Sequence, residues 1–322
     1  MLKGINGEIF MVKDIQEVHK RILILDEMYK EIKPKSLYRE SVLLEAFSSA
    51  TIEGAKTTLN EVRRCLGKQS TKSNKMVENV YNVLIKLYNS SAGLTYENLY
   101  GYWIQVVDGV CENTNIRGKL YRSGMVYIED EDRVVHTPAK PQQIKGCMRE
   151  LFNFLENSKM HPLVSTIIGH FYFVYVHPFC DGNGRMARIL ELQYLQKHGY
   201  PNIIYVSVSS AINNKLNRYY KSILTSENVV QGKIDLSPFI LYMLEIYIDA
   251  INTLIQGQIG LSQREKLILS KVKVYNQISV AKAKGILNCS ESTARSVLNK
   301  LKLRGYFSTY KEGRKVIYNR IR

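Results

Sequence analysis

The residues from 177 to 188, HPFCDGNGRMAR, gather unusual chemistry into one turn between two apolar segments of helical spacing. Gly182 and Gly184 allow the backbone to turn tightly and leave its N–H groups uncovered. The next residues begin a helix, whose first N–H groups lack intrahelical partners and whose dipole favours anions. The turn and the helix start together predict a phosphate-binding cradle.

Five further side chains around this cradle fit the same chemistry. Asn183 can donate an amide N–H to a phosphate oxygen without adding charge. Arg185 and Arg188 are three residues apart, so both project over the helix start, where a guanidinium fork suits phosphate. Asp181 offers the single carboxylate that commonly holds Mg²⁺ beside phosphates. His177 has the pKa range of a general base.

The set predicts phosphoryl or nucleotidyl transfer. The cradle and a metal ion would hold a nucleotide, and His177 would deprotonate an attacking hydroxyl. For any one of these residues taken alone, a glycine-rich turn between helices with a buried histidine is the favoured interpretation. The whole set at this spacing favours the transfer site.

HPFCDGNGRMAR resembles the signature of the Fic family, HPFx(D/E)GNGRxxR, at every fixed position. The resemblance implies a helical Fic core that uses ATP and Mg²⁺ to transfer AMP to a Tyr, Thr or Ser hydroxyl of a target protein. It implies that His177 is the base, Asp181 the Mg²⁺ ligand and Arg188 the partner of the γ-phosphate. The other residues implied to bind ATP here are Gly182, Asn183, Gly184, Arg185, Met186 and Ala187.

Residues 118–143 carry a β-hairpin signal, because apolar runs at 126–128 and 134–135 flank an acidic turn. The segment is similar to the family's flap, on which a target protein docks by strand addition. An ordinary surface hairpin is the alternative. The flap residues implied to lie nearest ATP are Val126, Tyr127, Ile128 and Glu129. Tyr219 and Tyr220 match an aromatic pair near the adenine, although such a pair on a helix also suits a core.

A second pattern lies upstream, where Ser49 precedes Glu53 by four residues and Gly54 follows. It resembles the family's inhibitory (S/T)xxxE(G/N) motif, in the class whose inhibitory helix is N-terminal. Taken alone, the pattern also describes a helix that ends with Gly at C′. Glu53 could pair with Arg188 and so withhold it from the γ-phosphate. We therefore expect an autoinhibited chain.

Apolar spacing predicts a mainly α fold with one hairpin. The predicted helices cover about 14–32, 41–52, 59–66, 74–89, 95–110, 142–157, 162–176, 184–198, 209–227 and 238–258. The resemblance covers roughly residues 1–260. We expect an N-terminal helical region with the inhibitory motif over 1–95, a Fic core over 96–260 and a winged-helix domain over 261–322.

The last segment is strongly basic. From Ser262 to Arg322 there are 15 Lys and Arg against three Glu, most of the chain's formal charge of +16. Three helical patterns and a hairpin turning at 312–313 predict a winged helix. Its predicted inward stripe is Ala294, Val297, Leu298 and Leu301; its predicted outward polar residues are Arg295, Asn299, Lys300, Lys302 and Arg304, with Arg314 and Lys315 on the wing. Such a face could bind DNA, or it could dock protein.

Composition sets the remaining expectations. With 322 residues and 45% hydrophobic content, the chain is globular and long enough for two or three domains. No stretch resembles a membrane span or a signal peptide, so we expect no membrane association. The five scattered cysteines lack zinc or CxxC spacing, so free thiols and a cytoplasmic location are expected. An oligomer remains possible.

Two other functions stay open from the sequence. The first is a DNA-binding regulator whose Fic core senses a nucleotide, although a pure sensor would not need His177. The second keeps the enzyme but changes its direction or donor, such as removal of AMP, with Glu53 placing a water, or transfer of another phosphate-linked group.

Overall fold

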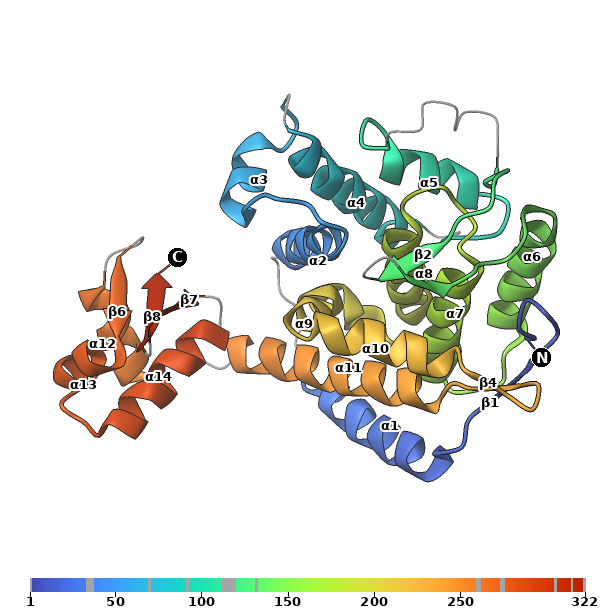
Figure 1. The fold of residues 1–322 in the computed structure, drawn as a ribbon. Helices are drawn as coiled ribbons and strands as arrows, with labels where there is room; N and C mark the ends of the chain where they lie inside the picture. The colour runs from blue at the N-terminus through green and yellow to red at the C-terminus, as the bar shows by residue number, and fades with distance from the viewer. Residues whose placement is uncertain are drawn as a thin grey trace. The chain divides into compact units, whose positions relative to one another are not determined.

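The computed structural model describes residues 2–32, 38–68, 71–90, 93–111, 120–130, 133–258, 262–272, 276–303, 306–313 and 315–320. The fold is mainly helical, as predicted (Figure 1). The chain forms two compact units: residues 1–30 with 34–250, and residues 31–33 with 251–322. Residues on both sides of the predicted boundary at 95/96 belong to the first unit, and the division of that unit into two domains stays a prediction.

Two helices at the centre of the first unit carry the HPFCDGNGR loop. They are α7 (Pro162–Val176) and α8 (Asn183–Lys197), which pack against each other. Both are buried along most of their length, as expected for helices that are apolar on nearly all sides. The loop is therefore clamped at both ends by buried helices.

The inhibitory pattern ends α2 (Tyr38–Ile52), which packs on α4 (Lys72–Tyr88) and α9 (Val208–Asn214). Gly54 has φ +87°. Its N–H donates to Thr51 O at 3.0 Å, and the Ala55 N–H donates to Ala50 O at 3.0 Å. These are the paired bonds of a Schellman motif, so the glycine does end the helix. A short helix, α3 (Leu59–Cys65), follows with a capping box at its start.

Further helices complete the first unit, and the last of them continues past residue 250 into the second (Figure 1). They are α1 (Ile15–Lys30), α5 (Leu99–Val107), α6 (Pro141–Asn157), α10 (Leu216–Ser226) and α11 (Ser237–Gln258), with a 3-10 turn at Pro201–Tyr205. The single helix predicted over 209–227 is wrong, because the chain breaks into α9 and α10 at Lys215. Asn213 and Asn214, which precede the break, have low helix propensity.

The predicted hairpin is present as β2 (Ile128–Asp130) and β3 (Arg133–His136), which pair antiparallel. The strand begins at Ile128 rather than Val126, and the register shifts between Ile128 and Glu129. Residues 118, 119, 131 and 132 of the predicted flap lie outside the described residues. A small sheet in the order β1-β5-β4 was not predicted; it joins β1 (Ile9–Met11), β5 (Lys233–Asp235) and β4 (Val229–Val230).

The second unit contains the three predicted helices and the hairpin. Its elements are α12 (Gln263–Lys271), β6 (Gln277–Ser279), α13 (Val280–Leu287), α14 (Glu291–Leu303), β7 (Phe307–Glu312) and β8 (Lys315–Arg320). Strand β6 was not predicted and pairs with β8. The predicted inward stripe of α14 is buried in the core of this unit. Arg304 and Arg314 lie outside the described residues, and the winged-helix assignment stays a prediction.

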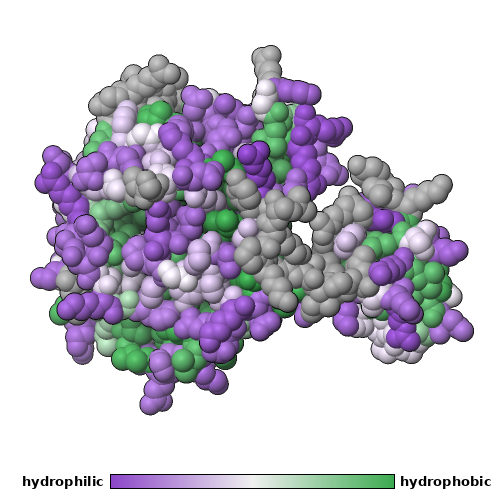
Figure 2. Space-filling model, turned by 180° about the vertical axis from the view of Figure 1, so that it is seen from behind, coloured by the Kyte–Doolittle hydropathy of each residue, from purple (hydrophilic) through white to green (hydrophobic). Residues whose placement is uncertain are grey.

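One described helix segment, Ser237–Gln256 in α11, is long and apolar enough to cross a membrane by length and composition, and 50% of that window is buried. Phe239, Ile240 and Met243 on it are fully buried. The face in Figure 2 is mostly hydrophilic with scattered apolar patches, and such patches are ordinary on protein surfaces. About half of this apolar segment is thus packed inside the protein.

Candidate active site

His177 ends α7 in the left-handed conformation, with φ 51° and ψ 61°. Its ring Nδ1 lies 3.2 Å from Val174 O. A carbonyl oxygen only accepts, so Nδ1 carries the proton and Nε2 keeps a lone pair. Burial lowers the pKa of His177 to about 4. The ring is therefore neutral near pH 7, with Nε2 ready to take a proton.

We expect the His177 ring to titrate well below the ordinary histidine range. Because its pKa is lowered, the neutral form persists as the pH falls from 8 through 6, and protonation occurs near pH 4. NMR titration of the six histidines in the whole protein, with His177→Ala to assign the resonance, measures this midpoint. A midpoint at or above 6.5 would contradict the buried, neutral ring.

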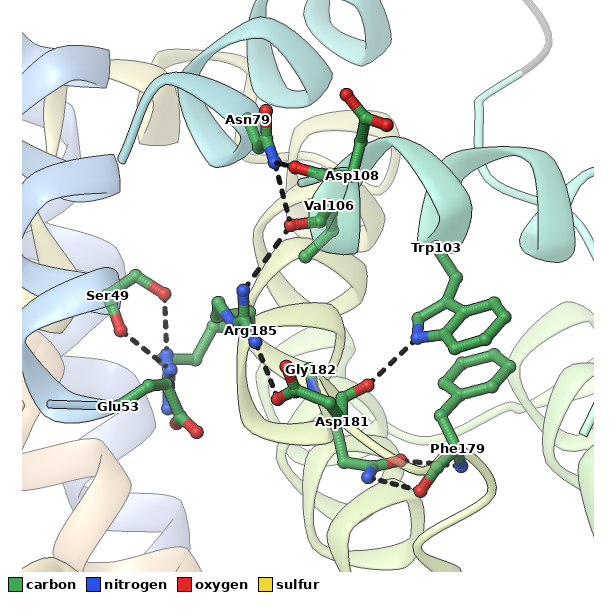
Figure 3. A network of polar contacts seen from close by, with 12 residues as sticks. Ser49, Glu53, Asn79, Trp103, Val106, Asp108, Phe179, Asp181, Gly182 and Arg185 are labelled. Carbon is green, nitrogen blue, oxygen red and sulfur yellow. Dashed lines mark hydrogen bonds and ion pairs between the residues drawn. The ribbon is translucent and has the colours of Figure 1, made fainter. Parts of the chain in front are cut away.

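The loop after His177 is held by packing and backbone contacts. The Phe179 ring stacks on Trp103 with centroids 4.4 Å apart, and Trp103 Nε1 donates to Asp181 O at 2.9 Å. Asn183 Oδ1 accepts from Phe179 N, and Asn183 Nδ2 donates to Phe179 O, both at 2.9 Å (Figure 3). We expected Asn183 to donate to phosphate. In this structure its oxygen and one amide N–H bind the Phe179 backbone and hold the loop. The amide carries a second N–H, so the phosphate contact stays a prediction.

Asp181 and Arg185 form a second brace. Asp181 Oδ1 accepts from Gly182 N at 2.5 Å and from Arg185 Nη2 at 2.7 Å. Arg185 is buried and its Nη1 donates to Val106 O at 3.3 Å (Figure 3). Its Nε is buried without a hydrogen-bond partner among the described residues. The Asp181 side chain keeps 36% of its surface exposed, so its carboxylate reaches solvent.

Arg188 is 2% exposed and bonds to the end of α2. Its Nε donates to Ser49 Oγ at 2.9 Å, and its Nη2 donates to Ser49 O at 3.0 Å and to Glu53 Oε1 at 2.8 Å (Figure 3). The expected ion pair with Glu53 is present. Arg188 Nη1 is buried without a hydrogen-bond partner within the described ranges. A donor remains for an anion.

Glu53 also lies over the cradle. A Cβ added at Gly184 would sit 2.4 Å from Glu53 Oε1 and 3.2 Å from Arg188 Nη1. The bare backbone of Gly184 is thus needed for the close approach of an oxygen-bearing group. The carboxylate oxygen of Glu53 therefore lies directly against the Gly184 backbone, on the side where Arg188 Nη1 also lies.

Glu45 is a residue that our sequence analysis missed. It precedes Ser49 and Glu53 by four and eight residues, so the three share one face of α2. It is buried, and it accepts hydrogen bonds from Ser207 Oγ at 3.1 Å, Ser209 N at 2.9 Å and Ser209 Oγ. Burial raises the pKa of Glu45. The signal was a lone carboxylate in an apolar helical run, spaced one turn before Ser49.

The two members of the predicted tyrosine pair differ in burial. Tyr219 is buried, and its hydroxyl lies 2.8 Å from His170 Nε2. Tyr220 is 45% exposed, and the two rings meet edge to face with centroids 5.3 Å apart. Because Tyr219 packs in the core, only Tyr220 offers exposed ring surface to a nucleotide.

The remaining predicted ATP-binding residues also include both buried and exposed side chains. Met186 and Ala187 are fully buried on α8, so their side chains face the core rather than a ligand. Tyr127 is 56% exposed just before β2, and Val126 and Ile128 are partly buried. The side chain of Glu129 lies outside the described residues.

The chain is similar in sequence to known proteins. Residues 99–195 match the model of the Fic/DOC family. The chain is 25% identical over 273 residues to a protein adenylyltransferase Fic from Drosophila yakuba, covering 79% of this chain and 51% of that relative. A Nematostella vectensis protein of the same name is 27% identical over 184 residues, covering 53% and 41%. The chain thus spans about half the length of these curated relatives.

Solved structures show the same fold. A Fic family protein from Desulfovibrio desulfuricans matches with TM-score 0.67 and 22% identity over 96% of this chain and 97% of that chain. A Fic domain-containing signaling protein from Bacteroides thetaiotaomicron matches with TM-score 0.59 and 20% identity, covering 73% and 96%.

Proposed function

The chain carries a Fic/DOC domain, and from that premise we propose that it is an autoinhibited protein adenylyltransferase. It would transfer AMP from ATP to a Tyr, Thr or Ser hydroxyl of a target protein. One observation carries the proposal: His177 is neutral and Arg188 is buried at opposite ends of a glycine loop, and the described residues offer no hydrogen-bond partner to His177 Nε2 or Arg188 Nη1. The adenylyltransferase names of the relatives support it.

The reaction needs one proton acceptor and a held triphosphate. The target hydroxyl oxygen would form a bond to the α-phosphorus of ATP while the bridging bond to the β-phosphate oxygen breaks and pyrophosphate leaves. His177 Nε2 would take the hydroxyl proton. The backbone N–H groups at the start of α8 and the free Nη1 of Arg188 would hold phosphate oxygens.

The donor set fits Mg²⁺ in the form that accompanies a nucleotide. Among the described residues no group of three or more His, Cys, Asp or Glu could hold a metal by itself. Mg²⁺ commonly takes one or two carboxylates together with substrate phosphates, and Asp181 keeps part of its carboxylate exposed at the loop. The ion would neutralise charge on the phosphates. Asp181 would be its protein ligand.

Autoinhibition follows from competition for Arg188. Glu53 takes one hydrogen bond from this guanidinium and places a carboxylate oxygen against Gly184. A γ-phosphate entering the cradle would meet that negative charge, and Arg188 would be partly engaged. ATP would then bind in an unproductive position or not at all.

The flap supports docking of the target. β2 and β3 form a sheet of two strands, and a two-stranded ribbon can accept an added strand. Tyr127 and Val134, both exposed, lie on this ribbon or at its start. We propose that the target segment bearing the hydroxyl pairs with this hairpin.

The test is transfer of labelled AMP. The whole protein and its Glu53→Gly variant are incubated with α-labelled ATP, Mg²⁺ and cell lysate, and labelled proteins are detected on a gel. Incorporation that rises in the variant supports the proposal. Removal of AMP from premodified proteins, without incorporation, would instead support the reverse reaction.

A second candidate activity, DNA binding, is favoured by the charge of the second unit. Residues 262–322 carry 15 of the 45 Lys and Arg of the chain. On α14, Arg295, Lys300 and Lys302 are exposed while the opposite face is buried in the core. A basic, exposed helix on a small compact unit suits the phosphate backbone of DNA.

We expect the whole protein to retard duplex DNA in a gel at 50 mM salt and to lose this binding as salt rises. Replacing both Lys300 and Lys302 with Gln should lower the salt slope of log K by about two, since each phosphate contact contributes about one. Lys20→Gln, on an exposed position of α1, is the matched control. Absence of any shift at low salt would exclude this candidate.

A further inference from the structure

Arg122 lies between the flap and the candidate base, and it was not singled out from the sequence. It is 7% exposed. Its Nε donates to His177 O at 2.7 Å, and its Nη2 donates to Ala139 O and, at 3.4 Å, to Val176 O. Its Nη1 donates to Gly124 O at 2.8 Å. Four backbone carbonyls from three segments therefore converge on one guanidinium.

The carbonyls of Val176 and His177 belong to the end of α7, where a helix has unpaired carbonyls and a partial negative charge. A cation placed there donates to the unpaired carbonyl oxygens and balances the partial negative charge of the helix end. The backbone N–H of Arg122 adds a bond to Pro178 O at 3.1 Å. Arg122 thus binds the carbonyl oxygens of Val176, His177 and Pro178, and so caps the C-terminal end of α7 next to the candidate base.

This cap acts on a strained residue. His177 is not glycine, yet it has φ 51°, a left-handed backbone conformation that is unfavourable for residues with a Cβ. The backbone there sets the direction of the ring, and the ring in turn places Nδ1 against Val174 O. The bond from Arg122 to His177 O is therefore one of the contacts that hold the ring with Nε2 free.

The other two carbonyls flank the flap. Gly124 precedes β2 and Ala139 follows β3, so the same guanidinium closes the base of the hairpin. Within the described residues no carboxylate pairs with Arg122, so the side chain serves carbonyls alone. A planar fork with five N–H donors can reach several carbonyls at once, whereas a lysine ammonium cannot reproduce this geometry.

We propose that Arg122 is a positioning residue. It fixes the position of the flap relative to His177 and holds the His177 ring in its proton-accepting orientation. The proposal rests on the proposed adenylyl transfer for its effect on rate. Its structural part does not, because the orientation of His177 can be observed without any reaction.

The experiment uses the whole chain carrying Glu53→Gly as parent, with Arg122→Met and Arg122→Lys introduced into it. Arg21→Met is the matched control, since Arg21 also donates to a backbone carbonyl, that of Leu241, at 2.9 Å but lies on α1. Three quantities are measured: kcat for AMP transfer, the Kd of ATP by calorimetry, and the tautomer of the His177 ring from its ¹⁵N shifts.

For Arg122→Met we expect kcat to fall about 10²-fold while the Kd of ATP changes less than about threefold, because the base is misplaced and the cradle is not. The Nδ1–H tautomer should give way to a mixture. Arg122→Lys should recover part of kcat, and Arg21→Met should match the parent in all three.

Parent-like kcat with an unchanged tautomer in Arg122→Met would overturn the proposal, as would equal losses in kcat and ATP affinity. If thermal unfolding shows that Arg122→Met does not fold, Arg122→Lys decides: a native melting curve with kcat and tautomer equal to the parent overturns the proposal. A parent without AMP transfer refutes the proposed function instead, and the tautomer measurement still tests Arg122.

Discussion

The Glu53→Gly variant of the whole protein is expected to transfer AMP about 10- to 150-fold faster than the wild type. Hydrogen bonds to charged groups contribute about 1.5–3 kcal/mol. Each 1.4 kcal/mol that no longer opposes productive ATP binding is worth about tenfold in rate. The measurement is initial AMP incorporation from α-labelled ATP at fixed target concentration.

The geometry explains why one residue should matter this much. Of the three hydrogen bonds that Arg188 makes to the α2 end, two go to Ser49 and survive the change. Loss of the Glu53 carboxylate removes a negative charge from the Gly184 side of the cradle and releases one N–H of Arg188 Nη2, which joins Nη1 as a donor for phosphate oxygens. The phosphate cradle thus loses the Glu53 carboxylate while Arg188 stays bound to Ser49.

Two companion variants separate this mechanism from a general loosening of α2. Glu53→Gln keeps an oxygen acceptor for Arg188 but removes the charge, so its activity should lie between those of wild type and Glu53→Gly. Glu40→Gln, near the start of α2, breaks an exposed ion pair to Arg63 on α3 and should leave activity unchanged. Equal incorporation by wild type and Glu53→Gly would mean that Glu53 does not restrain the site.

Much of the central architecture follows from local rules. The apolar run that becomes α7 must end at His177 because Pro178 follows, and Gly182, with φ +81°, begins the next helix. Gly54 ends α2 for the same kind of local reason. In that case the two interpretations of the pattern are compatible, because the helix end that Gly54 forms is what places Glu53 beside Arg188.

What could not be predicted depends on contacts between distant segments. Arg185 binds Val106 O, and Arg122 binds Ala139 O and His177 O, across separations that no local spacing encodes. Asn183 has a side chain suited to phosphate, and its oxygen and one of its two amide N–H groups also bind the Phe179 backbone, which local spacing did not indicate. A motif identifies residues that belong together, but packing decides which of them face the ligand and which brace the loop.

Replacing His177 with Ala in the Glu53→Gly background should lower AMP transfer about 10²- to 10⁴-fold, the usual contribution of a general base. The ring Nε2 is the acceptor that the loop geometry leaves free, since Nδ1 is engaged by Val174 O. The groups that we propose to hold the ATP phosphates include Arg188, at the opposite end of the loop. Calorimetry should therefore show ATP affinity close to that of Glu53→Gly alone.

The same background supplies a matched control in His198→Ala. His198 is exposed at the C-terminal end of α8, where its Nδ1 contacts Tyr194 O at 2.8 Å, an arrangement like that of His177 but remote from the loop. It should retain full transfer. If the Glu53→Gly/His177→Ala protein still modifies its target at the parent's rate, the proton leaves by another route and His177 is not the base. A fall in ATP affinity that matches the fall in transfer would assign His177 to binding rather than to proton removal.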